Sequence, residues 1–167
     1  MQNTTQEEHK LELATALLNS GRNIRIKALG TRMLPTIWPS DILLIESTLY
    51  DELIRGDVVL VKRENSILIH RLVKRSGLQW ITRGDAMPQD DPPVASVAVL
   101  GRVSEIQRRR RVVVPKRRIL PLQRVLAWVL CHSRICRTVA LLAHSARDRS
   151  SQQIGEIPLA HGSPQTN

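Results

Sequence analysis

The feature that most constrains the fold is a series of short apolar runs between Asn23 and Arg111. Aliphatic and β-branched residues dominate each run, and Gly or Pro stands between them. The runs read IRIKAL, DILLIE, DVVLVKR, SILIHRLVKR, QWITRG and VLGRVSEI. Short runs bounded by turn residues are typical of strands that pair with their neighbours through short connections. The sequence therefore predicts a compact, mainly β domain with mostly antiparallel strands.

Helical segments are expected on both sides of this domain. An acidic first turn after Thr4 or Thr5 and an apolar side predict an N-terminal helix that ends near Gly21. Beyond the domain, Pro115 and Pro121 bracket a basic linker before a second helical pattern. The predicted organisation is an N-terminal helix over 1–22, a β-domain over 23–107, a basic linker and amphipathic helix over 108–147, and a flexible tail over 148–167.

Composition limits the classes of protein to consider. The 167 residues suit one domain with appendages, and the formal charge of +10 is concentrated in the run from 108 to 118. Cys131 and Cys136 are spaced unlike a metal pair or a disulfide framework, so we interpret them as reduced thiols. The N-terminus is acidic, unlike an export signal. The longest apolar run, Val125 to Cys131, is far shorter than the about 20 residues that cross a bilayer. We expect a cytoplasmic protein, with peripheral contact to a membrane.

Three short stretches of the predicted domain carry residues of the types that act in catalysis or binding. GTRMLPT contains Met33 and Pro35, SILIHRLV contains His70, and TRGDAMPQDD contains Asp85 and Asp91. Each is a weak signal alone, because a strand histidine is more often structural and Gly-Asp or Asp-Asp more often forms a turn. Together, in this order, they resemble the type I signal peptidases, especially the branch with a histidine base. The resemblance covers about Ile24 to Ile106.

That family follows a frame of G-x-S-M-x-P-T, then G-D, then H-R, then G-D-N-N-x-x-D-D, and then G-x-V. The matching residues are Gly30, Met33, Pro35, Thr36, Gly56, Asp57, His70, Arg71, Gly84, Asp85, Asp90, Asp91, Gly101 and Val103. The resemblance implies a signal-peptidase/LexA-like β-domain that uses no metal and no cofactor.

The resemblance also implies roles for individual residues. His70 corresponds to the general base and Asp91 to the acid that orients it. Asp57 and Asp85 correspond to structural turn residues. The residues implied to contact a bound peptide are Met33, Pro35 and Thr36.

The nucleophile position departs from the family. Arg32 stands where the family has serine, and a guanidinium cannot supply the nucleophilic oxygen that acyl transfer requires. Ser40-Asp41 replaces the family's usual Gly-Asp, and Ala86-Met87 replaces its Asn pair. Thr31 and Thr36 carry nearby hydroxyls, but an adjacent residue on an extended segment points to the opposite face. The Ser-Lys mechanism of self-cleaving repressors also lacks its serine here, and Lys62 comes too early for its base.

Two functions remain open on this basis. One is a serine peptidase homologue of the signal peptidase I type with little or no proteolytic activity. The alternative is a peptide-binding or scaffolding module for a leader peptide or protein partner, since β-augmentation needs no serine. Arg32 then pairs with Asp90 or Asp91, accepts an acidic group of the peptide, or points into solvent.

The basic segment predicts a further partner. Residues 108–140 combine a cationic run with an apolar helical stripe, which suits the surface of an anionic membrane. The alternative is a helix that packs on the β-domain behind a solvated linker. Nucleic acid is disfavoured, because aromatic residues are only 2% of the chain and offer few stacking platforms.

Overall fold

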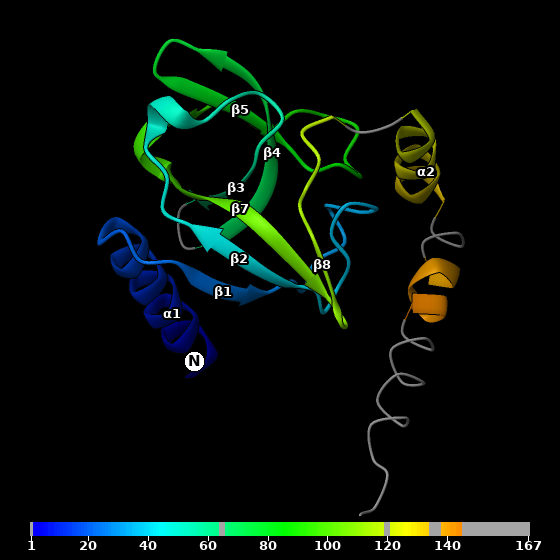
Figure 1. Ribbon diagram of the computed structural model, residues 1–167, viewed down its shortest axis with the longest axis horizontal. Helices are drawn as coiled ribbons and strands as arrows, with labels where there is room; N and C mark the ends of the chain where they lie inside the picture. The colour runs from blue at the N-terminus through cyan, green and yellow to red at the C-terminus, as the bar shows by residue number, and fades with distance from the viewer. Residues whose placement is uncertain (1, 64–65, 119–120, 134–137, 145–167) are drawn as a thin grey trace, which may run out of the picture.

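The computed structural model describes residues 2–63, 66–118, 121–133 and 138–144, and it is mainly β, as predicted. The elements in chain order are α1 (Gln2–Asn19), β1 (Ile24–Lys27), β2 (Ile42–Glu46), η1 (Tyr50–Glu52), β3 (Val58–Arg63), β4 (Ser66–Ser76), β5 (Gln79–Arg83), β6 (Val94–Ala95), η2 (Ser96–Ala98), β7 (Val99–Arg108), β8 (Arg111–Val113) and α2 (Pro121–His132). Residues 138–144 are also helical. Figure 1 shows α1 beside β1 and α2 at the opposite end of the view, beyond β8.

The strands form one antiparallel sheet in the order β1-β2-β7-β3-β4-β5-β6, with β8 paired to β7. The central strand β3 is buried on both faces. Val58 and Leu60 enter a core completed by Leu18 of α1, whereas Val59 and Val61 enter a second core around Trp80. This alternation follows from the two-residue period of a strand. The sheet therefore has a hydrophobic layer on each side of its centre.

Every strand predicted from the apolar runs is present, and β6 and β8 are additional. The β-domain extends beyond its predicted end at 107, because Arg111–Val113 turns back and pairs with β7. The predicted C-terminal helix is divided: α2 ends at His132 and helix is present again at 138–144. Cys136 and the tail 148–167 lie outside the described residues.

The basic run is partly built into the fold, whereas one of the two alternatives drawn from the sequence made it a solvated linker. Arg108 Nη2 donates to Asp41 Oδ2 over 2.6 Å, and Arg117 Nε donates to Asp57 Oδ1 over 2.7 Å. The helical residues 138–144 contact the domain as well, since the His144 ring stacks on Trp38 with centroids 4.7 Å apart. Ion pairing of these cations to buried carboxylates fixes the segment in place and lowers the charge available to a membrane.

Candidate active-site frame and peptide groove

His70 lies on β4 and is held by a carboxylate from the loop after β5. Its Nδ1 lies 2.5 Å from Asp91 Oδ2, and the ring is 2% exposed. The Thr82 hydroxyl donates to the same Asp91 oxygen over 2.6 Å, and the Asp91 amide donates to the Thr82 carbonyl over 2.8 Å. Asp91 is thus fixed from both its side chain and its backbone, and it orients the imidazole.

The other ring nitrogen of His70 is the distinctive atom of this site. With Nδ1–H donating to a carboxylate, Nε2 is the acceptor nitrogen of the neutral ring. Within the described part of the chain, His70 Nε2 and Trp80 Nε1 are the buried side-chain atoms that lack a hydrogen-bond partner. In a Ser-His-Asp relay this second nitrogen is the one that accepts the proton of the nucleophile. The geometry is that of an oriented base.

Arg32 lies on a loop that rests against the end of β5. The Ala86 amide donates to the Arg32 carbonyl over 2.9 Å. A Cβ added at Gly84 would lie 2.6 Å from that carbonyl oxygen and 2.8 Å from Met87 Cγ, so glycine is required for this approach. The backbone of residue 32 is therefore fixed beside the Gly84-Asp85 turn, while its side chain is exposed.

The exposed side of Arg32 borders a cavity of about 540 Å³, here called the Arg32 groove. Its lining residues are Arg32, Lys62, Arg63, Ser66, Leu68, Val94, Ala95 and Ala98. Leu68 and His70 are two residues apart on β4 and pair with Val61 and Val59, so both face the same side of the sheet. The groove and the His70–Asp91 pair thus share one side of β4.

An ion pair between Arg32 and Asp90 or Asp91, one of the roles considered for this residue, is absent from the described part of the structure. Asp90 Oδ1 lies 3.2 Å from Arg83 Nη1, and Asp91 is occupied by His70 and Thr82. The two remaining roles considered for Arg32 are contact with an acidic ligand group and exposure to solvent.

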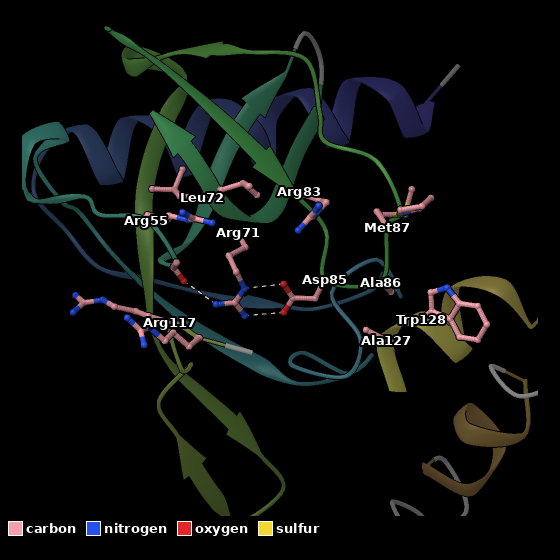
Figure 2. A pocket seen from close by; sticks show the side chains of 14 residues that line it. Arg55, Arg71, Leu72, Arg83, Asp85, Ala86, Met87, Arg117, Ala127 and Trp128 are labelled. Atoms are coloured by element: carbon pink, nitrogen blue, oxygen red, sulfur yellow. Dashed lines mark hydrogen bonds and ion pairs between the residues drawn. The ribbon is translucent and has the colours of Figure 1, made fainter. Parts of the chain in front are cut away.

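The resemblance implied that Asp85 shapes a turn. In the structure, its carboxylate also contacts residues far away in the chain. Arg71 donates through Nε to Asp85 Oδ1 and through Nη2 to Asp85 Oδ2, each over 2.7 Å. Figure 2 shows this paired contact as two dashed lines. The Thr36 hydroxyl donates to Asp85 as well, and the Arg71 and Asp85 side chains are 8% and 1% exposed. Asp85 therefore ties the residue 32 loop to β4.

Asp57 does act at a turn, and it also makes a longer-range contact. The Ile54 amide donates to Asp57 Oδ2 over 3.1 Å, which closes the turn before β3. Arg117 occupies the other oxygen, Oδ1. This carboxylate thus connects the start of β3 to the segment after β8.

The residues expected to contact a peptide are used inside the domain. Met33 is 4% exposed and packs in the core, Pro35 is buried, and the Thr36 hydroxyl is engaged by Asp85. None of them lines the Arg32 groove. These residues anchor the loop that presents residue 32, and contact of their side chains with a peptide stays a prediction. Thr36 is likewise unsuited as a replacement nucleophile, because Asp85 and Arg71 surround its hydroxyl.

Ser40 takes the backbone conformation expected of the glycine it replaces. Its φ is 73°, in the left-handed region that favours glycine. The neighbouring Asp41 is buried, accepts from the Trp38 amide over 2.8 Å and pairs with Arg108. The turn is preserved at the expense of local backbone strain.

The sequence did not predict several of the residues that line the Arg32 groove. Val94 and Ala95 form β6, which is too short to show a strand pattern, and Arg63 is placed by its Nη2 donating to the Pro92 carbonyl over 2.6 Å. The position of Leu68 was predictable, because it precedes His70 by two residues on a strand and therefore faces the same side of the sheet. Lys62, which comes too early in the sequence for the base of a Ser-Lys mechanism, lines the groove.

No cluster of metal-ligating side chains is present among the described residues. Over the same part of the chain, no helix has the length and apolar character needed to cross a bilayer. Comparisons with protein-family models, with curated proteins and with solved structures found no match. The functional argument accordingly rests on the geometry of the site.

Proposed function

We propose that this chain is a homologue of the type I signal peptidases that binds an extended peptide and cleaves it slowly or not at all. The single observation that carries the proposal is the oriented His70, whose Nε2 has no partner among the described residues, in a chain with arginine at the nucleophile position. The resemblance in motif order supports the family, and the arrangement of the groove supports the binding role.

The absence of a hydroxyl at residue 32 argues against acyl transfer. A base contributes to this chemistry by taking a proton from a nucleophile within hydrogen-bond reach. Arg32 has only donor groups and stays protonated, so His70 has no proton to remove from it. Binding of an extended peptide needs no nucleophile and is compatible with this substitution.

The edge of the sheet supports peptide binding. β6 ends the strand order and pairs with β5 alone among the described strands. Its two residues, Val94 and Ala95, line the Arg32 groove. An edge strand offers unpaired main-chain groups to an added strand, and pockets beside it select side chains. An extended peptide therefore fits along β6 with its side chains in the groove.

The charge of the groove indicates the kind of peptide. Arg32, Lys62 and Arg63 line it, and none of its lining residues is acidic. A carboxylate on the peptide can form a charge-assisted pair with the exposed guanidinium of Arg32. We accordingly assign an acidic residue to the peptide position that faces residue 32.

The test uses three labelled peptides of alternating valine and threonine that differ only in a central Glu, Gln or Lys. Fluorescence anisotropy should rank their affinities Glu, Gln, Lys, with about a tenfold range, equivalent to about 1.4 kcal/mol. Arg32→Ala should abolish the ranking, whereas Arg22→Ala, which removes an exposed arginine outside the groove, should preserve it. Methylation of the peptide amides should abolish binding. Equal affinity for all three peptides, or binding that survives amide methylation, would contradict the proposal.

A second candidate function is association with an anionic membrane surface through α2. Leu122, Val125 and Leu126 are exposed and lie at helical spacings that place them on one face. Exposed arginines at 109–111 and 118 add positive charge. Co-sedimentation with phosphatidylglycerol vesicles should be lost at high salt and in a Leu122→Asp/Val125→Asp variant. Equal pelleting with neutral vesicles would contradict this role.

A further inference from the structure

A second cavity, on the side of β4 to which Arg71 points, concentrates arginines from separate parts of the chain. This arginine cavity has a volume of about 1130 Å³. Its charged lining residues are Arg55, Arg71, Arg83, Arg117, Arg118 and Asp85. Figure 2 shows Arg55 and Arg83 on either side of Arg71, with Met87 and Trp128 along another wall.

Asp85, the carboxylate of the cavity, neutralises Arg71 and not the other arginines. Both oxygens of Asp85 are taken by Arg71 and Thr36. Arg71 also donates through Nη1 to the carbonyls of Gly56 and Lys116, over 2.7 and 2.8 Å. Asp85 and Arg71 thus form a closed unit that supports the floor of the cavity, and Asp85 has no oxygen left for the other arginines.

The remaining arginines keep donors for a ligand. Arg55 and Arg118 are exposed and form no ion pair with any described residue. Arg83 pairs with Asp90 at 3.2 Å, but both side chains are nearly half exposed, so water screens the pair. Arg117 uses Nε for Asp57, which fixes the start of its guanidinium group.

From this arrangement we infer that the arginine cavity binds a ligand with two or more phosphoryl groups. Guanidinium groups match phosphate oxygens with paired donors and retain their charge at any physiological pH. Arg55 and Arg118 have no ion pair among the described residues, so they add unneutralised positive charge to the cavity, and an entering anion relieves their repulsion. The volume exceeds what an inorganic phosphate needs, and the wall formed by Met87, Ala127 and Trp128 accommodates an organic portion.

This inference goes beyond the proposed peptide binding and is independent of it. The same chemistry is available from a soluble diphosphate or from phosphate headgroups of a membrane. Calorimetric titration with inorganic pyrophosphate and with ADP covers the first source, and flotation with phosphatidylglycerol vesicles covers the second. The peptide titration above serves as the internal reference for the other site.

The variant to test is Arg55→Gln/Arg118→Gln, which removes two cations that have no structural partner in the described chain. The matched control is Arg22→Gln/Arg25→Gln, which removes equal charge from exposed positions outside the cavity. Thermal unfolding of both variants should match that of the parent. We expect the first variant to lose about tenfold or more in affinity, and the control to lose less than about twofold.

The results distinguish a soluble ligand from a lipid headgroup, and they distinguish this inference from the proposed peptide binding. Arg55- and Arg118-dependent binding of pyrophosphate or ADP supports a soluble ligand, and the same dependence seen only with vesicles supports a lipid headgroup. No dependence with any probe, or equal losses in the control variant, would overturn the inference. Peptide affinity should be unchanged in the Arg55→Gln/Arg118→Gln variant, so failure of one proposal is distinguishable from failure of the other.

Discussion

His70 and Arg71 are consecutive residues of β4, but their side chains differ in how many of their hydrogen-bonding atoms are used. Arg71 points toward Asp85, and its guanidinium is fully occupied by a carboxylate and two backbone carbonyls. His70 points toward Asp91, which occupies only one of its nitrogens. Both side chains are buried. The difference teaches that burial and ion pairing alone do not identify a functional residue in this domain.

The state of the unused hydrogen-bonding atoms distinguishes the two sites. A buried polar atom without a partner loses its hydration and gains nothing in return, which destabilises the fold. Arg71–Asp85 therefore belongs to the framework, whereas His70–Asp91 keeps a ring nitrogen without a partner in the described chain, the feature on which the proposed function rests.

The largest expected effect comes from breaking the framework. Asp85→Ala leaves the buried Arg71 charge uncompensated, and removal of one partner of a buried pair costs about 3–5 kcal/mol. The free energy of unfolding from urea titration measures the loss. Asp90→Ala, which breaks the exposed pair with Arg83, is the control and should cost about 0–1 kcal/mol. Similar losses in both variants would remove the distinction between framework and surface pairs.

The contact that fixes residue 32 should give the next largest effect. Gly84→Ala forces a Cβ against the Arg32 carbonyl, and such overpacking costs about 1–3 kcal/mol. The same shift displaces residue 32, so affinity for the Glu peptide should also fall. Gly30→Ala is the control, because nothing lies within 4 Å of its added Cβ. Unchanged stability and affinity in Gly84→Ala would show that the loop is not held there.

Replacement of the histidine should have a smaller effect on stability than loss of Asp85. His70→Gln keeps a polar side chain of similar size, and Asp91 is 20% exposed and retains its bond from Thr82. We expect a loss of about 0.5–1.5 kcal/mol, the usual net contribution of one hydrogen bond. Urea titration beside Asp85→Ala makes the comparison direct. A loss as large as that of Asp85→Ala would place His70 in the framework.

The smallest effect is a gain in stability at Ser40. Ser40→Gly removes the strain of a left-handed residue, about 1–2 kcal/mol, and raises the entropy of the unfolded chain by about 0.4–1 kcal/mol. Because the second effect offsets the first, the net gain in the free energy of unfolding should lie within about 0–1.6 kcal/mol. Ser40→Ala keeps the Cβ and should gain nothing. A stabilisation by alanine equal to that by glycine would show that the backbone is not the cause.

The sequence predicted local features better than distant contacts. Strands such as Val58–Arg63 follow from continuous aliphatic runs, and the pairing of His70 with Asp91 followed from motif order. By contrast, β6 is only two residues long, and β8 lies within an arginine-rich run without an alternating pattern. Partners far apart in the chain, such as Arg108 with Asp41, leave no local pattern. The sequence also did not show the direction of each side chain, so Met33, which is buried, was predicted to contact a peptide.

The most direct test of the central claim is restoration of the nucleophile. Arg32→Ser should place a hydroxyl at the position that the oriented His70 serves in the resembling family, and a fluorophosphonate probe reports an activated serine by covalent labelling. The account predicts labelling of Arg32→Ser, and none of the parent chain or of the Arg32→Ser/His70→Ala double variant. Labelling of the parent chain that depends on His70 would contradict the account, because the nucleophile would then lie elsewhere.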